Sequence, residues 1–460
     1  MPTISCNMIK CFFILAVLLM MGSSCKKFIQ VDVPDNQMTA ETVFANDSLA
    51  QAAVTGLYIK LMSNTKYLLN GGMSVFPGLS ADELVRTTPI ANEDQFYLNS
   101  LLADNQIVLT NLWKSAYTYI YQCNICVEGL QKSTGVSAGL NARLTGEVKF
   151  IRALCYFYLV NLYSDVPLAL STNADKNAVL PRTPSDAVYD QIVNDLLSAT
   201  DLLTNDNSNA YPSQLAAQAL LARVYLHRQQ WDKAESFSSV VINSGKCSLQ
   251  SNLASVFKSG SLETIFQLAP VLANINSVEG LIFIPASASS MPAYVIKTEL
   301  LNAFEPNDLR KTNWINSAKV GSQTYYYPYK YKVRSSATLT EYNVILRLAE
   351  QYLIRAEARA HQNKVADAVS DLNTIRNRAG LPLLSAAINT DSCMVAVERE
   401  RRTELFAEWG YRWFDLKRTN RANTILSAVK GSNWNSNDLL YPIPASEIET
   451  DPKLSQNPGY

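Results

Sequence analysis

The amino-acid sequence predicts a mainly α-helical fold: a scaffold of tetratricopeptide-like helical hairpins with loop-rich and short β insertions. Helical periodicity dominates the middle of the chain, and two segments, 213–243 and 346–377, each have the pattern of two helices joined by a turn. A shift of 134 residues aligns three pairs of side chains: Ala222 with Ala356, His227 with His361, and Ala234 with Ala368. Within each segment the alanines are 12 residues apart, which is the small-residue spacing of a tetratricopeptide hairpin.

The amino-acid composition favours some classes of function and argues against others. The chain has 460 residues, of which 48% are hydrophobic and 17% charged, so a large core is expected. The 40 Lys and Arg residues balance the 40 Asp and Glu residues, whereas duplex-DNA binders normally carry a positive excess, so no nucleic-acid partner is expected. The chain has 2 histidines, too few for a His-rich metal site, and their matching repeat positions favour packing. The 23 Tyr, 15 Phe and 6 Trp residues favour binding through rings.

The N-terminus has the pattern of an export signal. Residues 11–21 form an apolar run behind Lys10 that is too short to span a membrane, which needs about 20 apolar residues, but suits a signal peptide. Small residues at 22–24 then precede Cys25, an order that resembles a bacterial lipobox. We expect residues 1–24 to be a lipoprotein signal peptide and Cys25 to carry lipid. A plain secretory signal with a bystander cysteine is the alternative.

The other cysteines predict packing rather than chemistry. Beyond Cys25 there are 5, an odd number that prevents a complete disulfide framework. Cys123 and Cys126 form a C-x-x-C pair inside a predicted helix, without a second ligand pair for zinc. We therefore predict no metal and no cofactor.

Two regions interrupt the helical pattern. Residues 70–110 contain glycine and proline breaks, and residues 260–340 contain aromatic and β-branched segments that predict a few short strands and loops. Neither region has the long Pro/Gly/Ser linker that separates independent domains. The prediction is an N-terminal helical part, 25–250, and a C-terminal part, 251–460, in one compact unit.

Four segments together resemble the SusD/RagB family of outer-membrane nutrient-binding lipoproteins. Residues 146–168 resemble the family's long helix with its Ser-Asp-Val-Pro turn, and residues 181–196 its next helix start. Residues 397–418 are similar to its Glu-Arg…Gly-x-Arg…Asp-Leu-x-Arg stretch, and residues 441–460 to its Pro-Ile-Pro…Gln-Asn-Pro-Gly-Tyr ending. The order and spacing of these matches cover the whole mature chain.

Judged from their side chains alone, most of these motifs are expected to stabilise the fold rather than to bind a ligand. Phe406, Trp409 and Trp413 lie at i, i+3 and i+7 and are expected to form one buried helix face. The prolines of the C-terminal tail predict an extended strap laid over the body.

The resemblance implies a surface lipoprotein that binds an oligosaccharide or polysaccharide and delivers it to a SusC-like TonB-dependent outer-membrane transporter. It also implies a SusD-like α–α superhelix, a lipid anchor in the outer membrane with the body facing the cell exterior, and no catalysis. Sugar binding suits the composition, because the C–H face of a sugar stacks on Trp or Tyr while its hydroxyls bond to Asn, Asp, Gln and Arg.

No motif of the family identifies its ligand-binding residues in this sequence. The candidate carbohydrate-binding residues are therefore taken from the two loop-rich regions. The first region offers polar partners and one ring: Asp82, Glu83, Arg86, Asn92 and Tyr97. The second offers rings and flanking amides: Asn313, Trp314, Asn316, Tyr325, Tyr326 and Tyr327. Trp314 is the most attractive, since asparagines flank it. The alternating tyrosines, however, have the period of a strand whose ringed face can equally pack inside.

Two other function classes compete. A glycosidase needs two carboxylates about 5–10 Å apart in a cleft, but the densest carboxylates (Glu398, Glu400, Glu404, Glu408) lie along an apparently structural helix and no hydrolase signature is present. An exported tetratricopeptide adaptor for peptides or proteins is the second rival, although two legible hairpins are fewer than the three a free-standing array needs. Capture of a non-sugar nutrient with the same transporter partnership stays open.

Overall fold

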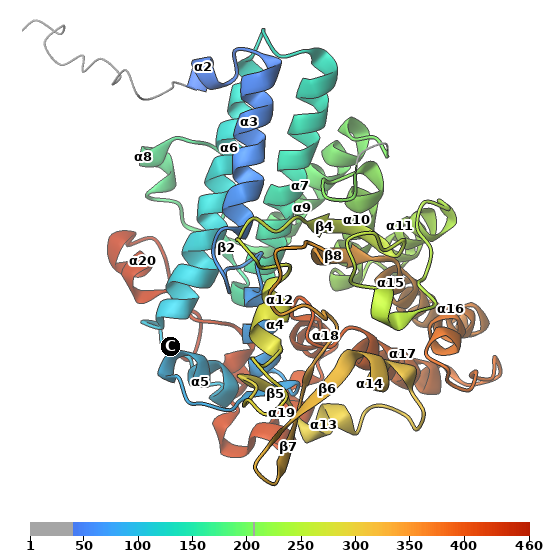
Figure 1. Cartoon of the computed structure of the whole chain (residues 1–460). Helices are drawn as coiled ribbons and strands as arrows, with labels where there is room; N and C mark the ends of the chain where they lie inside the picture. The colour runs from blue at the N-terminus through green and yellow to red at the C-terminus, as the bar shows by residue number, and fades with distance from the viewer. Residues whose placement is uncertain (1–39, 206–207) are drawn as a thin grey trace, which may run out of the picture.

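The computed structural model describes residues 40–205 and 208–460, and these residues form a mainly helical body (Figure 1). This architecture confirms the predicted fold class. None of the helices in the described part is both long enough and apolar enough to cross a bilayer. The expected signal peptide and Cys25 lie outside the described residues, so the anchor stays a prediction, as does the division of the body at residue 250.

The long helices of the N-terminal half pack around α7 (Figure 1). They are α3 (Asp47–Met62), α6 (Ser115–Lys132), α7 (Ala138–Tyr163) and α9 (Ser185–Leu202), with a π-helical segment η2 (Ile107–Lys114) leading into α6. Arg152 of α7 forms a bidentate pair with Asp195 of α9 at 2.7 and 2.8 Å, and it donates to Asn124 of α6 at 2.8 Å. Because an unpaired buried charge is costly, this contact fixes the three helices relative to one another.

Both predicted helical hairpins are present. The first is α10 (Gln214–His227) with α11 (Trp231–Asn243), and the second is α15 (Leu348–His361) with α16 (Val365–Arg378). The buried alanines Ala216, Ala219 and Ala222 leave room for close helix packing on α10. Helix α11 packs against α15, so the two hairpins stack in succession. At their junction Arg223 donates to both carboxylate oxygens of Glu350 at 2.7 and 2.8 Å.

The two histidines pack against rings, as their repeat positions predict. The His227 ring lies 4.9 Å from that of Phe157, and burial lowers its pKa well below the usual value. The His361 ring stacks on Trp231 with centroids 3.9 Å apart and planes 9° apart, so it joins the end of α15 to the start of α11.

The segment 397–418 differs from its prediction in one respect. Phe406, Trp409 and Trp413 are all buried, but they do not share one helix. Helix α17 (Thr390–Glu404) ends before them, and α18 (Tyr411–Arg418) begins after a tight turn. Trp409 and Gly410 have φ of 45° and 74° in that turn. A Cβ on Gly410 would lie 2.9 Å from Cβ of Pro77, so close packing as well as backbone conformation requires glycine there.

Short antiparallel strand pairs confirm the predicted β insertions. The pairs in the described residues are β1 (Leu84–Arg86) with β5 (Tyr294–Ile296), β2 (Val166–Pro167) with β3 (Arg182–Thr183), β4 (Thr264–Leu268) with β8 (Asn343–Arg347), and β6 (Ile315–Val320) with β7 (Gln323–Pro328). The shorter helices are α2 (Ala40–Val43), α4 (Gly72–Ser80), α5 (Ala91–Leu98), α8 (Ala174–Asn177), α12 (Val278–Phe283), α13 (Thr298–Leu301), α14 (Leu309–Trp314), α19 (Ala422–Lys430) and α20 (Ala445–Thr450), with 3-10 turns at Leu253–Ser255, Gly431–Asn433 and Ser436–Leu439.

The C-terminal tail lies over the N-terminal bundle as a strap, interrupted by α20. The Tyr441 amide donates to the Leu162 carbonyl at 2.9 Å, and Asn457 Nδ2 donates to the Tyr163 carbonyl at 3.0 Å. These contacts hold both ends of the tail against the end of α7.

The C-x-x-C pair serves packing, as predicted. Cys123 and Cys126 are buried free thiols, and burial raises the pKa of Cys126 to about 12. Among residues 40–205 and 208–460, no group of His, Cys, Asp or Glu side chains is arranged to hold a metal ion.

Candidate functional site

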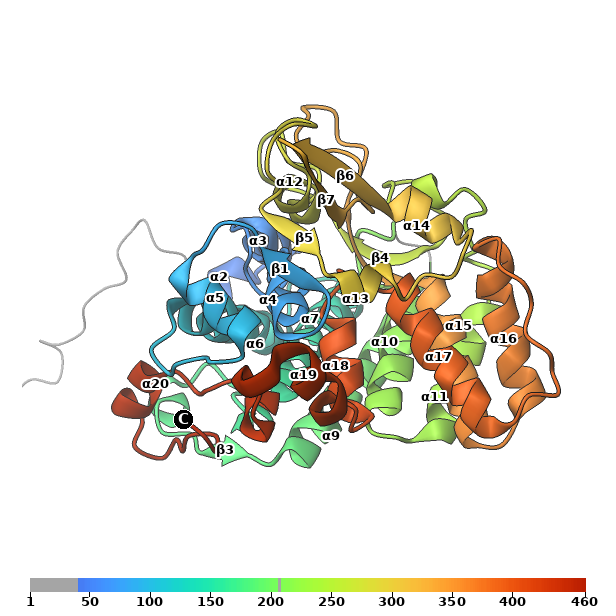
Figure 2. The same cartoon turned by 90° about the horizontal axis from the view of Figure 1, so that it is seen from below.

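The two loop-rich regions of the sequence meet on one face of the molecule. Strand β1 pairs with β5 so that Arg86 lies opposite Tyr294, and the Lys297 amide donates to the Glu83 carbonyl at 2.9 Å. Strand β5 in turn packs against β7, and Figure 2 shows β1, β5 and the β6–β7 hairpin following one another along one side. We call this surface the loop face; it comprises residues 84–98, 286–297 and 315–328.

A polar cluster that extends from the interior to the surface holds β1, α5 and β5 of the loop face together. The Glu93 carboxylate accepts from Lys66 Nζ at 2.7 Å, from Arg86 Nη1 at 2.6 Å and from the Tyr294 hydroxyl at 2.6 Å. Burial opposes ionisation of Glu93, but the hydrogen bonds from Lys66 and Tyr294 and the nearby positive charges lower its pKa below the ordinary value. Three donors on one carboxylate hold β1, α5 and β5 in a fixed arrangement, while Arg86 keeps about 11% of its side chain exposed.

The predicted ring residues of the hairpin divide into exposed and buried. Tyr326 lies opposite Ser317 and is 44% exposed, Tyr325 is half-buried, and Tyr327 is buried at 4%. No hydrogen bond joins the hydroxyl of Tyr325 or Tyr326 to another described residue. The exposed Asn316 accepts from the Ser317 amide at 2.8 Å through Oδ1. Adjacent strand residues point to opposite faces, so Tyr325 shares the face of the buried Tyr327, and the side chains that the hairpin leaves open are Tyr326 and Asn316.

Two further predicted residues lie on α5. Asn92 is half-buried, and its carbonyl accepts from Asn105 Nδ2 at 2.9 Å. The half-buried ring of Tyr97 has two ammonium groups near its face, Lys430 Nζ at 4.5 Å and Lys297 Nζ at 5.5 Å. Cation–π contacts of this kind fix the ring in place.

Asp82 and Glu83 are buried, which corrects the expectation that they are open to a ligand. Asp82 is 1% exposed and accepts from Arg412 Nε at 2.8 Å and Arg402 Nη2 at 2.6 Å. Burial opposes ionisation, but Arg412 and Arg402 lower its pKa. Glu83 is 2% exposed, and burial with the neighbouring Asp82 charge raises its pKa to about 8. Both carboxyls face the interior: Asp82 contacts arginines of α17 and α18, and Glu83 accepts from the Ala407 amide in the turn between these helices at 3.4 Å.

Trp314 is also buried, so the most attractive ring of the sequence cannot stack on a ligand. Its exposed fraction is 0%, and its indole N–H donates to the Leu253 carbonyl at 2.9 Å. Lys330 Nζ lies 4.8 Å from its ring centroid on the inner side. The half-buried Asn313 donates through Nδ2 to the Leu309 carbonyl at 2.8 Å within α14. The flanking asparagines misled the prediction, because they lie on the outer side of α14 and β6 while Trp314 points inward.

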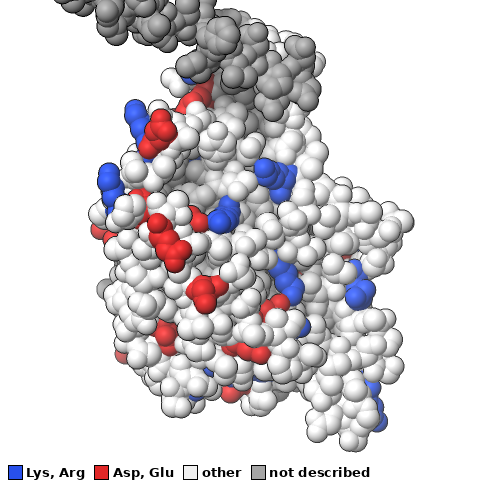
Figure 3. Space-filling view, turned by 90° about the vertical axis from the view of Figure 1, so that its left-hand side faces the viewer, with Lys and Arg blue, Asp and Glu red and all other residues white. Residues whose placement is uncertain are grey.

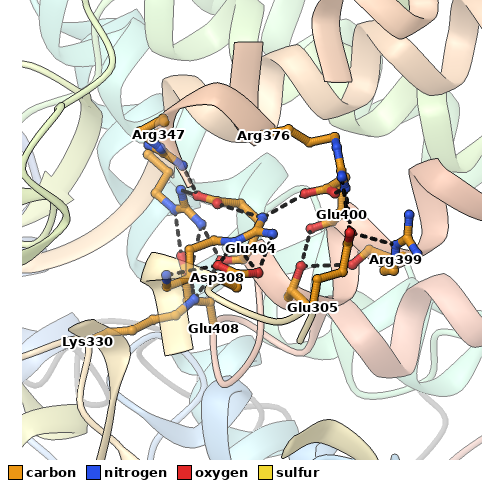
Figure 4. Close-up of polar contacts among 12 residues, drawn as sticks. Glu305, Asp308, Lys330, Arg347, Arg376, Arg399, Glu400, Glu404 and Glu408 are labelled. Atoms are coloured by element: carbon orange, nitrogen blue, oxygen red, sulfur yellow. Dashed lines mark hydrogen bonds and ion pairs between the residues drawn. The ribbon is translucent and has the colours of Figure 1, made fainter. Parts of the chain in front are cut away.

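The carboxylates that a glycosidase would need are occupied by arginines. Glu400, Glu404 and Glu408 are buried in an ion-pair network with residues of α14, β8 and α16 (Figure 4). Arg347 contacts Glu404 at 2.5 Å and Glu408 at 2.9 Å, Arg310 contacts Glu400 at 2.8 Å, and Arg376 contacts Glu400 at 2.6 Å. These contacts give Glu400, Glu404 and Glu408 a structural role, but Glu408 lies in the turn after α17 and not on the predicted helix.

Sequence reasoning missed three members of the polar cluster that fixes the loop face. Lys66, Glu93 and Tyr294 form the polar cluster with Arg86, but they come from three separate segments. The signal that could have joined them is the β1–β5 pairing, and three-residue strands are too short to show period-2 alternation.

A helical scaffold of stacked hairpins that presents a loop face with an exposed ring and amide side chains is typical of a binding protein. Comparison with known proteins agrees. A family model described as "SusD family" matches residues 302–460, and one described as "Starch-binding associating with outer membrane" matches residues 32–226. The chain belongs to the SusD/RagB family, a carbohydrate-binding family associated with the outer membrane.

Individual relatives support the assignment. SusD-like protein P25 of Formosa agariphila is 25% identical over 513 residues, covering 95% of this chain and 97% of that protein. The starch-binding protein SusD of Bacteroides thetaiotaomicron is 34% identical over 141 residues, 27% of this chain and 23% of that protein. A solved SusD superfamily protein from Bacteroides vulgatus has a TM-score of 0.80 at 20% identity, covering 91% of this chain and 100% of that one. A laminarin-binding SusD-like protein has a TM-score of 0.76 at 23% identity, covering 91% of this chain and 100% of that one.

Proposed function

We propose that this chain is a surface lipoprotein that binds an oligosaccharide or polysaccharide on its loop face and delivers it to a SusC-like TonB-dependent outer-membrane transporter. The observation that supports the proposal is the meeting of the two loop-rich regions, in which β5 connects β1, which carries Arg86, to β7, which carries the exposed Tyr326. A sugar ring needs a flat partner for its C–H face and fixed polar groups for its hydroxyls, and this face supplies both.

The charge distribution suits a neutral glycan. The Lys and Arg residues balance the Asp and Glu residues at 40 each. The side of the molecule that carries α5, α8 and α20 shows isolated positive and negative side chains among uncharged ones, without a field of one sign (Figure 3). A strongly charged polymer would be expected to meet a surface dominated by the opposite charge.

The membrane attachment is proposed to be lipid on Cys25, with the body facing the cell exterior. Two acyl chains are needed for stable attachment, since a single chain binds reversibly. A Cys25→Ala form is expected in the soluble fraction after cell lysis, whereas the parent chain stays with the outer membrane. Retention of the variant in the membrane would contradict the proposed anchor.

A calorimetric panel with the purified protein tests the proposed cargo. The panel contains laminarin- and starch-derived oligosaccharides and a set of short peptides, and each mixture is analysed afterwards for cleavage products. We expect at least one glycan to bind and to be recovered intact. Binding of peptides alone would favour the rival function, capture of a non-sugar nutrient, and hydrolysis of a glycan would favour an enzyme. Co-purification of a barrel transporter with the anchored protein tests the partner.

A further inference from the structure

A pocket separate from the loop face lies where the two helical hairpins meet α17 and α18. Its volume is about 350 Å³, which is within the lower range of small-molecule sites. Its walls come from the start of α11, the end of α15, the face of α17 and the end of α18, and Figure 2 shows these elements away from the β6–β7 hairpin. The lining includes Trp231, His361, Val395, Arg401, Arg418 and Arg421.

Arginines outnumber carboxylates in the lining of this pocket. The lining includes four arginines (Arg401, Arg412, Arg418, Arg421) and three acidic residues (Glu357, Glu398, Asp415). Each carboxylate is already shared: Asp415 by Arg401 and Arg418 at 2.7 and 2.8 Å, and Glu398 by Arg412 and Arg421 at 3.1 and 3.0 Å. Arg418 takes both oxygens of Glu357 at 2.5 and 2.8 Å. Arg412 also pairs with the buried Asp82 at 2.8 Å, so neighbouring carboxylates balance the four arginines of the lining.

One of these guanidinium groups has an unused donor. Arg401 is 3% exposed, and its Nη1 has no hydrogen-bond partner among the described residues. Leaving a buried donor of a charged group unpaired is costly, so such donors are normally satisfied. A carboxylate in the pocket would give Arg401 Nη1 its missing acceptor.

Part of the lining of the pocket is apolar. Val395 on α17 is 62% exposed, and the half-buried Met394 lies beside it. The stacked rings of Trp231 and His361, 3.9 Å apart, add a flat wall. A hydrated inorganic ion gains little from such surface, whereas an organic acid can place its body there.

We propose that this pocket is a second binding site, for a small organic ligand that bears one carboxylate next to an apolar or ring face. The carboxylate would bond to Arg401 with Arg421 at the rim, and the body would pack against Trp231 and Val395. A uronic-acid sugar and the C-terminal residues of a short peptide share this chemistry. The site does not depend on the function proposed for the loop face.

Matched probe pairs test the proposal by calorimetry with the purified protein. Glucuronic acid is compared with glucose, and a dipeptide with a free carboxylate is compared with its amide. We expect at least one acid to bind about tenfold or more tightly than its neutral counterpart. The pair that shows this difference identifies the source of the carboxylate.

A charge-reversing substitution at the rim of the pocket tests whether the acid binds there. Arg421 is exposed, so Arg421→Glu should fold and should weaken the acid about tenfold. Lys246→Glu, the same reversal at an exposed position outside the pocket, and Tyr326→Ala on the loop face should leave its affinity unchanged. The proposal is overturned if no acid binds at concentrations up to about 10 mM, if acids and neutral counterparts bind equally, or if Arg421→Glu binds like the parent.

Discussion

Arg347 and Glu404 form a fully buried ion pair in which Nη1 lies 2.5 Å from Oε1. Arg347 ends β8 immediately before the second hairpin, and Glu404 ends α17. The same guanidinium contacts Glu408, and the same carboxylate accepts from Arg378, so one pair connects several elements beneath the loop face (Figure 4). The carboxylates that are most concentrated in the sequence therefore hold the scaffold together.

Glu404→Gln should lower the free energy of unfolding by about 3–5 kcal/mol, because it leaves buried arginines without their counter-charge. Chemical denaturation at pH 7 measures this loss. Glu398→Gln, on the same helix with a side chain 32% exposed, is the matched control and should cost about 1 kcal/mol or less.

Burial opposes ionisation of Glu404, but Arg378, Arg347 and Arg310 hold its pKa well below the ordinary value. The parent should therefore lose stability more steeply than the variant as the pH falls below about 4.3, the pKa of an unfolded glutamate. Equal losses for the two variants would contradict the role given to Glu404.

Glu83→Gln should stabilise the protein, and by more at higher pH. Burial and the Asp82 charge raise the pKa of Glu83 from 4.5 to about 8, so the folded state binds a proton there that the unfolded state releases. Between these two values stability falls as the pH rises, because deprotonation favours the unfolded chain. The neutral glutamine avoids this loss, and we expect a gain on the order of 1–3 kcal/mol at pH 8 that disappears towards pH 4. Thermal melts of both proteins across this range measure the difference; a gain that does not vary with pH would refute the explanation.

Trp314→Ala should reduce stability rather than remove ligand contacts. The ring is completely buried and its N–H donates to Leu253, so truncation should cost about 3–5 kcal/mol. Under conditions where the variant is still folded, its affinity for the glycan should match that of the parent. A stable variant with a specific loss of glycan binding would show that Trp314 reaches the ligand after all.

Much of the scaffold could be predicted from the sequence because its signals are periodic and local. The alanine spacing identified both hairpins, and the matching histidines were assigned to packing, where the structure places His227 against Phe157 and His361 against Trp231. The break between α17 and α18 was missed because Trp409 adopts a positive φ that its residue type does not indicate.

The candidate site was predicted less well, for a physical reason. Sequence composition selected two regions that meet in the fold, but which side chains face outward depends on pairings between segments about 200 residues apart, such as Arg86 with Tyr294. Asp82 is a charged residue, yet it is buried because arginines of α17 and α18 pair with it. Trp314 has polar neighbours in the sequence, yet it is buried, and the Leu253 carbonyl accepts from its indole N–H.

If the exposed Tyr326 ring of the loop face binds a glycan, its removal must weaken that binding. The most direct measurement is the calorimetric affinity of Tyr326→Ala for the glycan that the panel identifies, with Tyr121→Ala as the control. Tyr326 and Tyr121 are 44% and 43% exposed, but Tyr121 lies on α6 outside the loop face. We predict about tenfold weaker binding for Tyr326→Ala, unchanged binding for Tyr121→Ala, and unchanged melting temperatures for both. Equal affinity of the two variants and the parent would contradict the account.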